Sequence, residues 1–332
     1  MEISEISHNK LNNESELKTI FHFQSLININ NIHSRTIYSL LKLHDGRIAT
    51  GSEDKSIIIT SLSIETKQWN QDIKRNNAHD DRIFSFCQMN TPNNNFLISC
   101  SGDATIKAWE LTNKSLEQRY TLLGHNSIIW NVILIHDTLL FSCSLDHTLK
   151  IWENIQLQTS IDFGTSINSI MKLRKKEIII VCCNSLIIYV YDIISYRTLN
   201  HIRGYYAFYS SHMAEISDGI IAISSYTKGF PLVIIDINTC CIIKEIMFKG
   251  NICSSLCCLD NRSFLYVDND VLIQISSEQY EIMLNLEHEI DINGYSGIII
   301  KDGQYLITTN EHNGISIIKL QYKTNYFSCI NY

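Results

Sequence analysis

The stretch His125–Glu153, HNSIIWNVILIHDTLLFSCSLDHTLKIWE, decides the fold of this 332-residue chain, because two earlier stretches repeat its pattern. They are His33–Thr60, HSRTIYSLLKLHDGRIATGSEDKSIIIT, and His79–Glu110. Each begins with a histidine, has an apolar residue four positions later, and leads to an aspartate followed by a closing apolar run. Such a unit cannot bury its apolar face alone, so the stacking of neighbouring units sets the architecture.

The composition is that of a globular chain without a strong charge. Hydrophobic residues make up 45% of it, which is enough to bury a sizeable core. The formal net charge is −7, and no run of like charges exceeds three residues. Because phosphate binding needs a basic footprint, we expect no nucleic acid among the partners.

Neither a secretory signal nor a membrane span is visible in the sequence. The most apolar stretch, Ile178–Ile194, is interrupted by Asn184, Ser185 and Asp192, and it predicts two buried strands. The eleven cysteines include no C-x-x-C pair. We therefore expect reduced thiols that serve as small core residues, and a cytoplasmic or nuclear location.

The spacing of the repeats predicts seven units. The residues that close the third strand of each unit recur every 39 to 49 positions: Thr60, Trp109, Trp152, Tyr191, Ile235, Gln274 and Ile318. A period of roughly 40–45 residues is typical of a four-stranded propeller blade. Residues 17–332 are therefore expected to form seven such units, whereas the polar residues 1–16 are expected to be a disordered tail.

These repeats resemble those of the WD-repeat β-propeller family, clearly in units one to three and in degenerate form in units four to seven. The resemblance implies an all-β fold, a single seven-bladed β-propeller of four-stranded antiparallel blades. It also implies that an N-terminal strand closes the ring as the outer strand of the last blade. Thr19–Ile29 alternates well enough for this role, and Gln321–Ile330 is the rival.

In this family a His, a Ser or Thr, an Asp and a Trp form hydrogen bonds within one blade. The matching residues are His33, Thr50 and Asp54 in unit one; His79, Ser99, Asp103 and Trp109 in unit two; and His125, Ser142, Asp146 and Trp152 in unit three. Unit four has Phe163, Val181 and Ser185 at these positions, and unit six keeps at most Asp268. A catalytic triad needs one copy in one pocket, so three copies favour a structural role.

No cofactor or metal site is predicted. The histidines form no closely spaced pair, and the Glu287–Glu289 patch would place its two carboxylates away from its histidine on a strand. The stretch GSEDKS lacks the ending of a phosphate-binding loop. We expect a protein without catalytic residues, metal ligands or bound cofactors.

The resemblance implies that protein partners bind on the top face of the ring. The candidate contact residues are Arg35, Tyr38, Glu53, Arg82, Phe84, Asn126, Trp130 and Leu145. Aromatic and arginine side chains dominate interface energetics, although the three aromatic residues could instead be ordinary packing of an inner strand. Tyr205, Tyr206 and Phe208 offer a second group in the degenerate half.

The expected function is that of a non-catalytic scaffold or adaptor, monomeric or part of a hetero-complex. One alternative is the substrate receptor of a ubiquitin ligase, but Thr112 and Ile155 stand where such relatives carry an arginine. A second is an enzyme that uses the central channel. A third is recruitment to phosphoinositides through the basic cluster Arg174–Lys176. The sequence leaves the partner and its pathway open.

Overall fold

The computed structural model describes most of the chain. The described residues are 20–184, 187–204, 212–224, 231–247, 253–259, 263–268, 271–276, 282–287, 299–302, 305–310 and 312–323. The predicted tail, residues 1–16, lies outside them, as do Ser185, Tyr205, Tyr206, Phe208 and Glu287–Glu289 apart from the backbone of Glu287.

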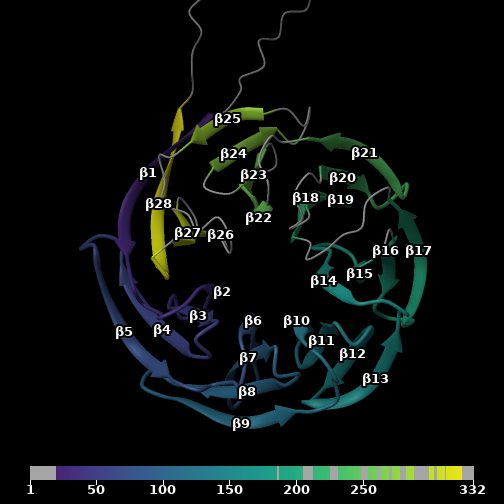
Figure 1. Ribbon diagram of the computed structural model, residues 1–332, viewed down its shortest axis with the longest axis horizontal. Helices are drawn as coiled ribbons and strands as arrows, with labels where there is room; N and C mark the ends of the chain where they lie inside the picture. Colours follow the sequence, from purple (N-terminus) through teal and green to yellow (C-terminus); the bar gives the residue numbers. More distant parts are fainter. Residues whose placement is uncertain are drawn as a thin grey trace, which may run out of the picture.

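The described residues form seven antiparallel sheets of four strands, arranged as blades around a central axis (Figure 1). This confirms the predicted seven-bladed β-propeller. Blades 1 to 3 consist of β2 Ile37–Lys42, β3 Ile48–Ser52, β4 Ile57–Ser63 and β5 Gln68–Arg75; β6 Ile83–Asn90, β7 Asn95–Ser101, β8 Ile106–Leu111 and β9 Leu116–Leu122; and β10 Ile129–His136, β11 Leu139–Ser144, β12 Thr148–Glu153 and β13 Gln156–Asp162.

The remaining blades have the same order from the axis outward. Blades 4 to 6 consist of β14 Ile167–Lys172, β15 Ile178–Cys183, β16 Ile187–Asp192 and β17 Arg197–Arg203; β18 His212–Ser217, β19 Ile220–Ser224, β20 Leu232–Asp236 and β21 Cys241–Ile246; and β22 Cys253–Cys258, β23 Ser263–Asp268, β24 Val271–Ser276 and β25 Ile282–Glu287. Blade 7 consists of β26 Ile299–Asp302, β27 Tyr305–Asn310, β28 Gly314–Lys323 and, on its outer side, β1 Ile20–Ile29.

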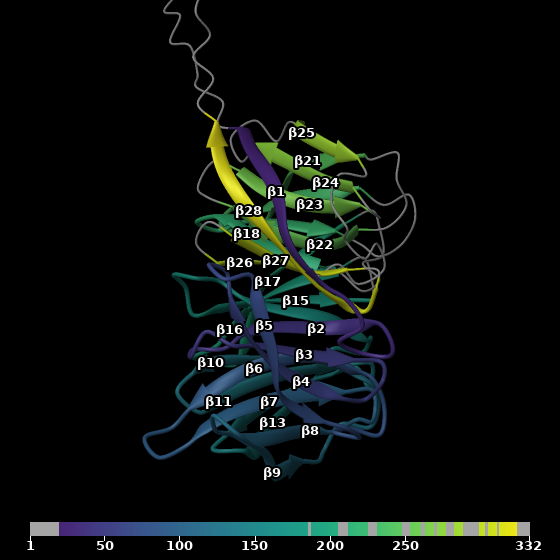
Figure 2. The same ribbon diagram turned by 90° about the vertical axis from the view of Figure 1, so that its left-hand side faces the viewer.

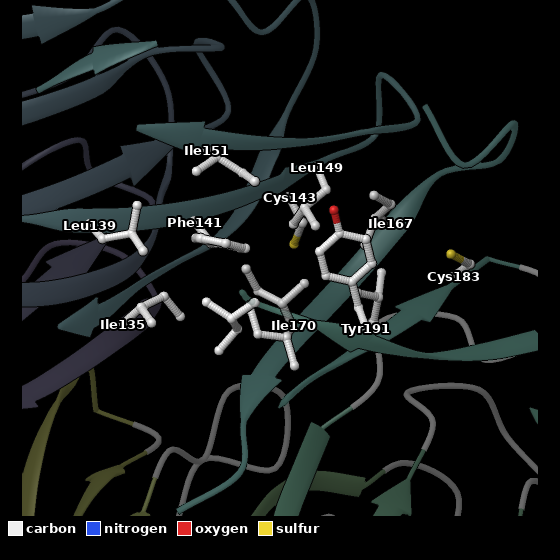
Figure 3. Packing of buried hydrophobic residues seen from close by; sticks show 13 residues of the cluster. Ile135, Leu139, Phe141, Cys143, Leu149, Ile151, Ile167, Ile170, Cys183 and Tyr191 are labelled. Atoms are coloured by element: carbon white, nitrogen blue, oxygen red, sulfur yellow. The ribbon is translucent and has the colours of Figure 1, made fainter. Parts of the chain in front are cut away.

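The core lies between neighbouring blades, where the apolar faces of two sheets meet. Figure 3 shows the cluster between blades 3 and 4, in which Phe141 of β11 and Ile151 of β12 pack towards Ile170 of β14 and Tyr191 of β16. The second strand of each well-described blade is almost wholly buried because both of its faces meet apolar neighbours. Each blade therefore depends on the two blades beside it.

The N-terminal strand closes the ring. β1 pairs with β28 in antiparallel register from Ile20 with Lys323 to Ile29 with Ile315, and the two strands run side by side in Figure 2. Ile27 and Ile29 are buried, as the alternation predicts. The rival prediction, that Gln321–Ile330 closes the ring, was wrong. The first residues of that segment, 321–323, belong to β28, the third strand of the same blade.

Blade 6 corrects the predicted alignment by one residue. In blade 2 Trp109 pairs with Leu97 and follows a bulge in the outer pairing; in blade 6 the same pairing and bulge fall on Ile275 rather than Gln274. Asp268 pairs with Cys253 as Ser101 pairs with Ile83, so it takes the position of that serine and not that of Asp103.

Candidate functional site: the top face of blades 1 to 3

The top face is defined here by two kinds of segment. One is the turn between the second and third strands of a blade, at residues 53–56, 102–105 and 145–147. The other is the loop that leads from the outer strand of one blade to the inner strand of the next, at residues 30–36, 76–82 and 123–128. The residues Lys55, Ala104 and His147 occupy the same place in the three turns with positive φ angles.

A chain of hydrogen bonds runs through blade 2 from a turn to a buried indole. His79 Nδ1 lies 2.8 Å from Asp103 Oδ2, and His79 Nε2 lies 2.7 Å from Ser99 Oγ. Trp109 Nε1 donates to Ser99 Oγ at 2.8 Å. Because the carboxylate can only accept, Nδ1 carries the proton, and the serine hydroxyl donates to Nε2.

Blade 3 has the same chain with nearly the same distances. His125 Nδ1 lies 2.8 Å from Asp146 Oδ2, His125 Nε2 lies 2.7 Å from Ser142 Oγ, and Trp152 Nε1 donates to Ser142 at 2.8 Å. Both histidine side chains are fully buried, so neither can touch a substrate. The His, Ser and Asp side chains are therefore a structural set.

Charge is held in the carboxylates of this set and not in the imidazoles. Burial would raise the pKa of Asp103, but the interactions with His79 and the hydrogen bonds from Thr105 and the Asp80 backbone together outweigh burial and lower that pKa far below its usual value. For Asp146, burial is likewise outweighed by hydrogen bonds from Thr148, the Asn126 backbone and His125, which lower the pKa to about 2. Burial lowers the pKa of His79 and of His125 despite their aspartates.

Blade 1 has the set without its tryptophan. His33 contacts Asp54 at 3.1 Å and Thr50 at 2.8 Å. Thr60 stands in place of the tryptophan, and its buried hydroxyl has no hydrogen-bond partner within the described residues. The Thr50 hydroxyl lies against the carbonyl of Ile58 at 3.3 Å instead.

Degenerate blades replace the set in two ways. In blade 4 the rings of Phe163 and Tyr191 lie 6.3 Å apart, the same separation as His79 and Trp109, so an apolar contact replaces the polar one. In blade 7 the buried Asn310 ties the turn by accepting from the backbone of His312 and Gly314. Its amide nitrogen also donates to Asn30 at 3.1 Å, which joins the turn to the segment after β1.

The loops of the top face are fastened to the turns by further hydrogen bonds that the sequence analysis did not identify. The hydroxyls of Ser52, Ser101 and Ser144 each donate to a loop carbonyl, at 3.0 to 3.2 Å. Each hydroxyl also accepts from the backbone of the aspartate two residues later, at 3.0 to 3.1 Å. The repeated Ser-x-Asp-x-[Ser/Thr] motif in the three turns was the available signal.

Three predicted contact residues form a continuous aromatic row across the blade boundaries. The rings of Tyr38 and Phe84 lie 5.5 Å apart, and those of Phe84 and Trp130 lie 4.7 Å apart, both in tilted geometry. All three are half-buried. Trp130 also packs against the core between blades 3 and 4, so the row combines inner-strand packing with a partly exposed surface.

Two predicted arginines meet a predicted glutamate between blades 1 and 2. Arg82 Nη2 lies 3.1 Å from Glu53 Oε1, and Arg35 Nη1 lies 3.5 Å from the same oxygen. The backbone of Asn126 donates to Asp146, and that of Leu145 donates to Ile128. Of these two residues, Asn126 is exposed and Leu145 is half-buried, and within the described residues no hydrogen bond or ion pair joins them to Arg35 or Arg82.

The basic cluster on blade 4 is engaged in contacts with blade 5. The Arg174 backbone and Nε donate to Glu215 Oε2 at 2.7 and 3.3 Å, and its Nη2 donates to the Glu215 carbonyl. Lys175 pairs with Asp218 at 3.4 Å, and Lys176 donates to Asn238. The cluster thus fastens blade 4 to blade 5.

Other site classes find no support in the part of the chain that the structure describes. Within it, no group of three or more His, Cys, Asp or Glu residues could hold a metal ion. The described residues also contain no helix long and apolar enough to cross a membrane. Thr112 and Ile155, which stand where ligase receptors carry an arginine, both lie in turns. Thr112 closes the turn before β9, and Ile155 lies in the turn before β13 with a positive φ.

Comparisons with known proteins agree with this geometry. The family described as "WD domain, G-beta repeat" matches residues 70–110 and 116–153. Protein CIA1 of Arabidopsis thaliana is 32% identical over 93 residues, which is 27% of this chain and 26% of that relative. The chain therefore matches about a quarter of the length of this curated relative.

Among solved structures, the WD40 β-propeller domain of Doa1 superposes with a TM-score of 0.72. The match covers 90% of this chain and 97% of that domain at 15% sequence identity, which shows a shared fold.

Proposed function

We propose that this chain, which is a WD-repeat β-propeller, is a non-catalytic adaptor that holds partner proteins on the top face of blades 1 to 3. Propellers of this kind generally serve as scaffolds for protein interactions. The observation that carries the proposal is the aromatic row Tyr38–Phe84–Trp130 beside the exposed arginines Arg35 and Arg82. Rigid aromatic and arginine side chains are the residue types that anchor interfaces.

The rigidity of this face supports the proposal. The loops that carry Arg35 and Arg82 are tied to the turns through the serine hydroxyls and the carboxylates of Asp54 and Asp103. A surface that is already ordered loses less conformational entropy on binding. The buried position of the His, Ser and Asp set supports a non-catalytic role, because a catalytic residue must reach its substrate.

The test is affinity purification of the tagged full chain from its own cells, with quantification of the proteins that copurify. We expect the Arg35→Glu, Arg82→Glu double variant to lose its main partners while its melting temperature stays the same. Arg119→Glu on β9 is the matched control, since Arg119 is 47% exposed and pairs with Glu110, much as Arg82 is 48% exposed and pairs with Glu53. Partners that survive the double variant would place the binding surface elsewhere.

We also propose that the protein works in the cytoplasm or the nucleus. Cys100 and Cys143 are fully buried free thiols whose pKa is raised by burial, as expected of core residues in a reducing compartment. Imaging of a fluorescent fusion of the full chain would test this, and accumulation in a secretory compartment would contradict it.

A further inference from the structure

The two arginines at the boundary between blades 1 and 2 share a single acceptor. Arg35 and Arg82 both contact Oε1 of Glu53, at 3.5 and 3.1 Å. Their side chains are 65% and 48% exposed, whereas that of Glu53 is 21% exposed. Each guanidinium has several N–H donors, so most of the donors of this pair face solvent.

Arg47 is an arginine of this protein with most of its N–H donors in hydrogen bonds. Its side chain is only 12% exposed and pairs with Asp45 at 2.7 Å. It also donates to the carbonyls of Thr112 and Asn113 in blade 2. By comparison, Arg35 and Arg82 use fewer of their N–H donors, and their exposure makes these donors available to a second carboxylate.

The carboxylate of Asp81, the residue that precedes Arg82, is held by other contacts. Asp81 accepts the backbone N–H of Arg82, and its Oδ2 would lie 2.6 Å from a Cβ at Gly102. Its carboxylate therefore lies against the turn of blade 2. Asp80, which precedes it, is exposed, and its backbone donates to Asp103.

The charged group and the aromatic row belong to one surface. Burial raises the pKa of the Tyr38 hydroxyl, the charge of Glu53 adds to that rise, and the charge of Arg82 opposes it. The phenol is therefore within electrostatic reach of the ion pairs, while its ring contacts Phe84. An occupant of this surface meets cationic donors at the rim and aromatic rings beside them.

We infer that the partner segment bound here presents an aspartate or glutamate side chain to Arg35 and Arg82, next to an apolar side chain that packs on the aromatic row. The inference rests on the proposed function and adds the chemistry of the partner. A cationic segment would be repelled by the exposed guanidinium groups. Glu53, the acidic residue beside them, already pairs with both arginines. Charge-assisted bonds between a guanidinium and a carboxylate are among the stronger contacts of an interface.

The test begins with a random peptide library displayed through the peptide C-terminus, so that every carboxylate on offer comes from a side chain. The library is selected on the full chain and counter-selected on the Arg35→Gln, Arg82→Gln variant. We expect enrichment of Asp or Glu beside Leu, Ile, Phe or Trp. Arg119→Gln is the control variant and should bind the same peptides as the wild type.

Selected peptides are then synthesised, and their Kd is measured by fluorescence anisotropy in a double-mutant cycle. Replacing the acidic residue by its amide should weaken binding about tenfold or more to the wild type, and by little to the double variant. Peptides that depend on Arg35 and Arg82 but tolerate the amide would overturn the inference and leave the proposed function standing. Peptides that bind the double variant as well as the wild type, or a library without dependent peptides, would count against both.

Discussion

At the scale of single residues, one aspartate per blade organises the top face. The carboxylate of Asp103 accepts from the ring of His79, the backbone of Asp80, and both the backbone and the hydroxyl of Thr105. It therefore joins the turn of blade 2 to the loop that enters that blade. The aspartates of blades 1 and 3 do the same for their own loops.

We expect Asp103→Ala and Asp146→Ala each to lower the free energy of unfolding by about 2–4 kcal/mol. Each change leaves a buried histidine without its acceptor and frees a tight turn. Asp80→Ala is the matched control, because it removes the same charge from an exposed position in the loop that Asp103 contacts. Urea unfolding of the three variants measures the effect, and equal losses in all three would contradict this assignment.

The buried histidines should make the protein sensitive to mild acid. The unfolded chain takes up protons near the ordinary histidine pKa of 6.5, whereas burial lowers the pKa of His79 and His125 in the fold. The unfolded state then binds more protons, so stability is greatest above about pH 6.5 and falls as the pH decreases below it. Urea midpoints at pH 7 and pH 5 should differ more for the wild type than for the His79→Gln, His125→Gln variant; parallel profiles would refute the argument.

At the scale of elements, the strands could be predicted from the sequence because their signals are local. Alternation over residues 19–29 indicates β1, and the turn residues mark the hairpins of blades 1 to 3. The register of blade 6 could not be predicted from the sequence, because the bulge before Ile275 depends on pairing with β25. Likewise, equivalent positions suggest Tyr38, Phe84 and Trp130, but their mutual contacts depend on how tightly neighbouring blades approach each other.

Contacts between elements also hold neighbouring blades together, in blades with the polar set and in blades without it. Gln88 of β6 accepts the backbone N–H of His44 in blade 1, and Glu215 of β18 accepts that of Arg174 in blade 4. A buried side chain on an inner strand thus holds the hairpin of the preceding blade in both halves of the ring. Lys175 and Lys176 strengthen this connection between blades 4 and 5.

The pairing of β1 with β28 should be sensitive to a single methyl group. A Cβ at Gly314 would lie 1.7 Å from the carbonyl oxygen of Ile29, so the two strands cannot keep their positions. We expect Gly314→Ala to cost more than about 2 kcal/mol and to speed proteolysis of residues 20–36. In Gly46→Ala, where φ is +88° and no atom lies within 4 Å, only backbone strain changes, so β1 should stay protected; similar cleavage of both variants would contradict the argument.

At the scale of the whole molecule, the boundaries of a sequence repeat do not coincide with the boundaries of a blade. The matched stretch 70–110 covers most of the outer strand of blade 1 and nearly all of the three inner strands of blade 2. Each repeat therefore links two blades, and the same offset makes β1 the missing strand of blade 7. The ring is closed by hydrogen bonds between distant parts of the chain and not by packing alone.

Deleting residues 1–16 should leave the fold intact, whereas deleting residues 1–29 should open the ring. The longer deletion removes β1 and exposes the edge of β28, which then offers unpaired backbone groups to other chains. Gel filtration and thermal unfolding of the two truncated proteins measure the difference. A longer deletion that stays monomeric and as stable as the full chain would show that β1 does not hold the ring closed.

The position of β1 also governs when folding can finish during synthesis. Residues 20–29 leave the ribosome first among the strands, yet their partner, residues 314–323, is made last. Bringing such distant segments together has a large loop-closure entropy and makes the final step slow. Until translation has passed residue 323, the nascent chain carries two unpaired strand edges, and we expect it to need protection by chaperones over that interval.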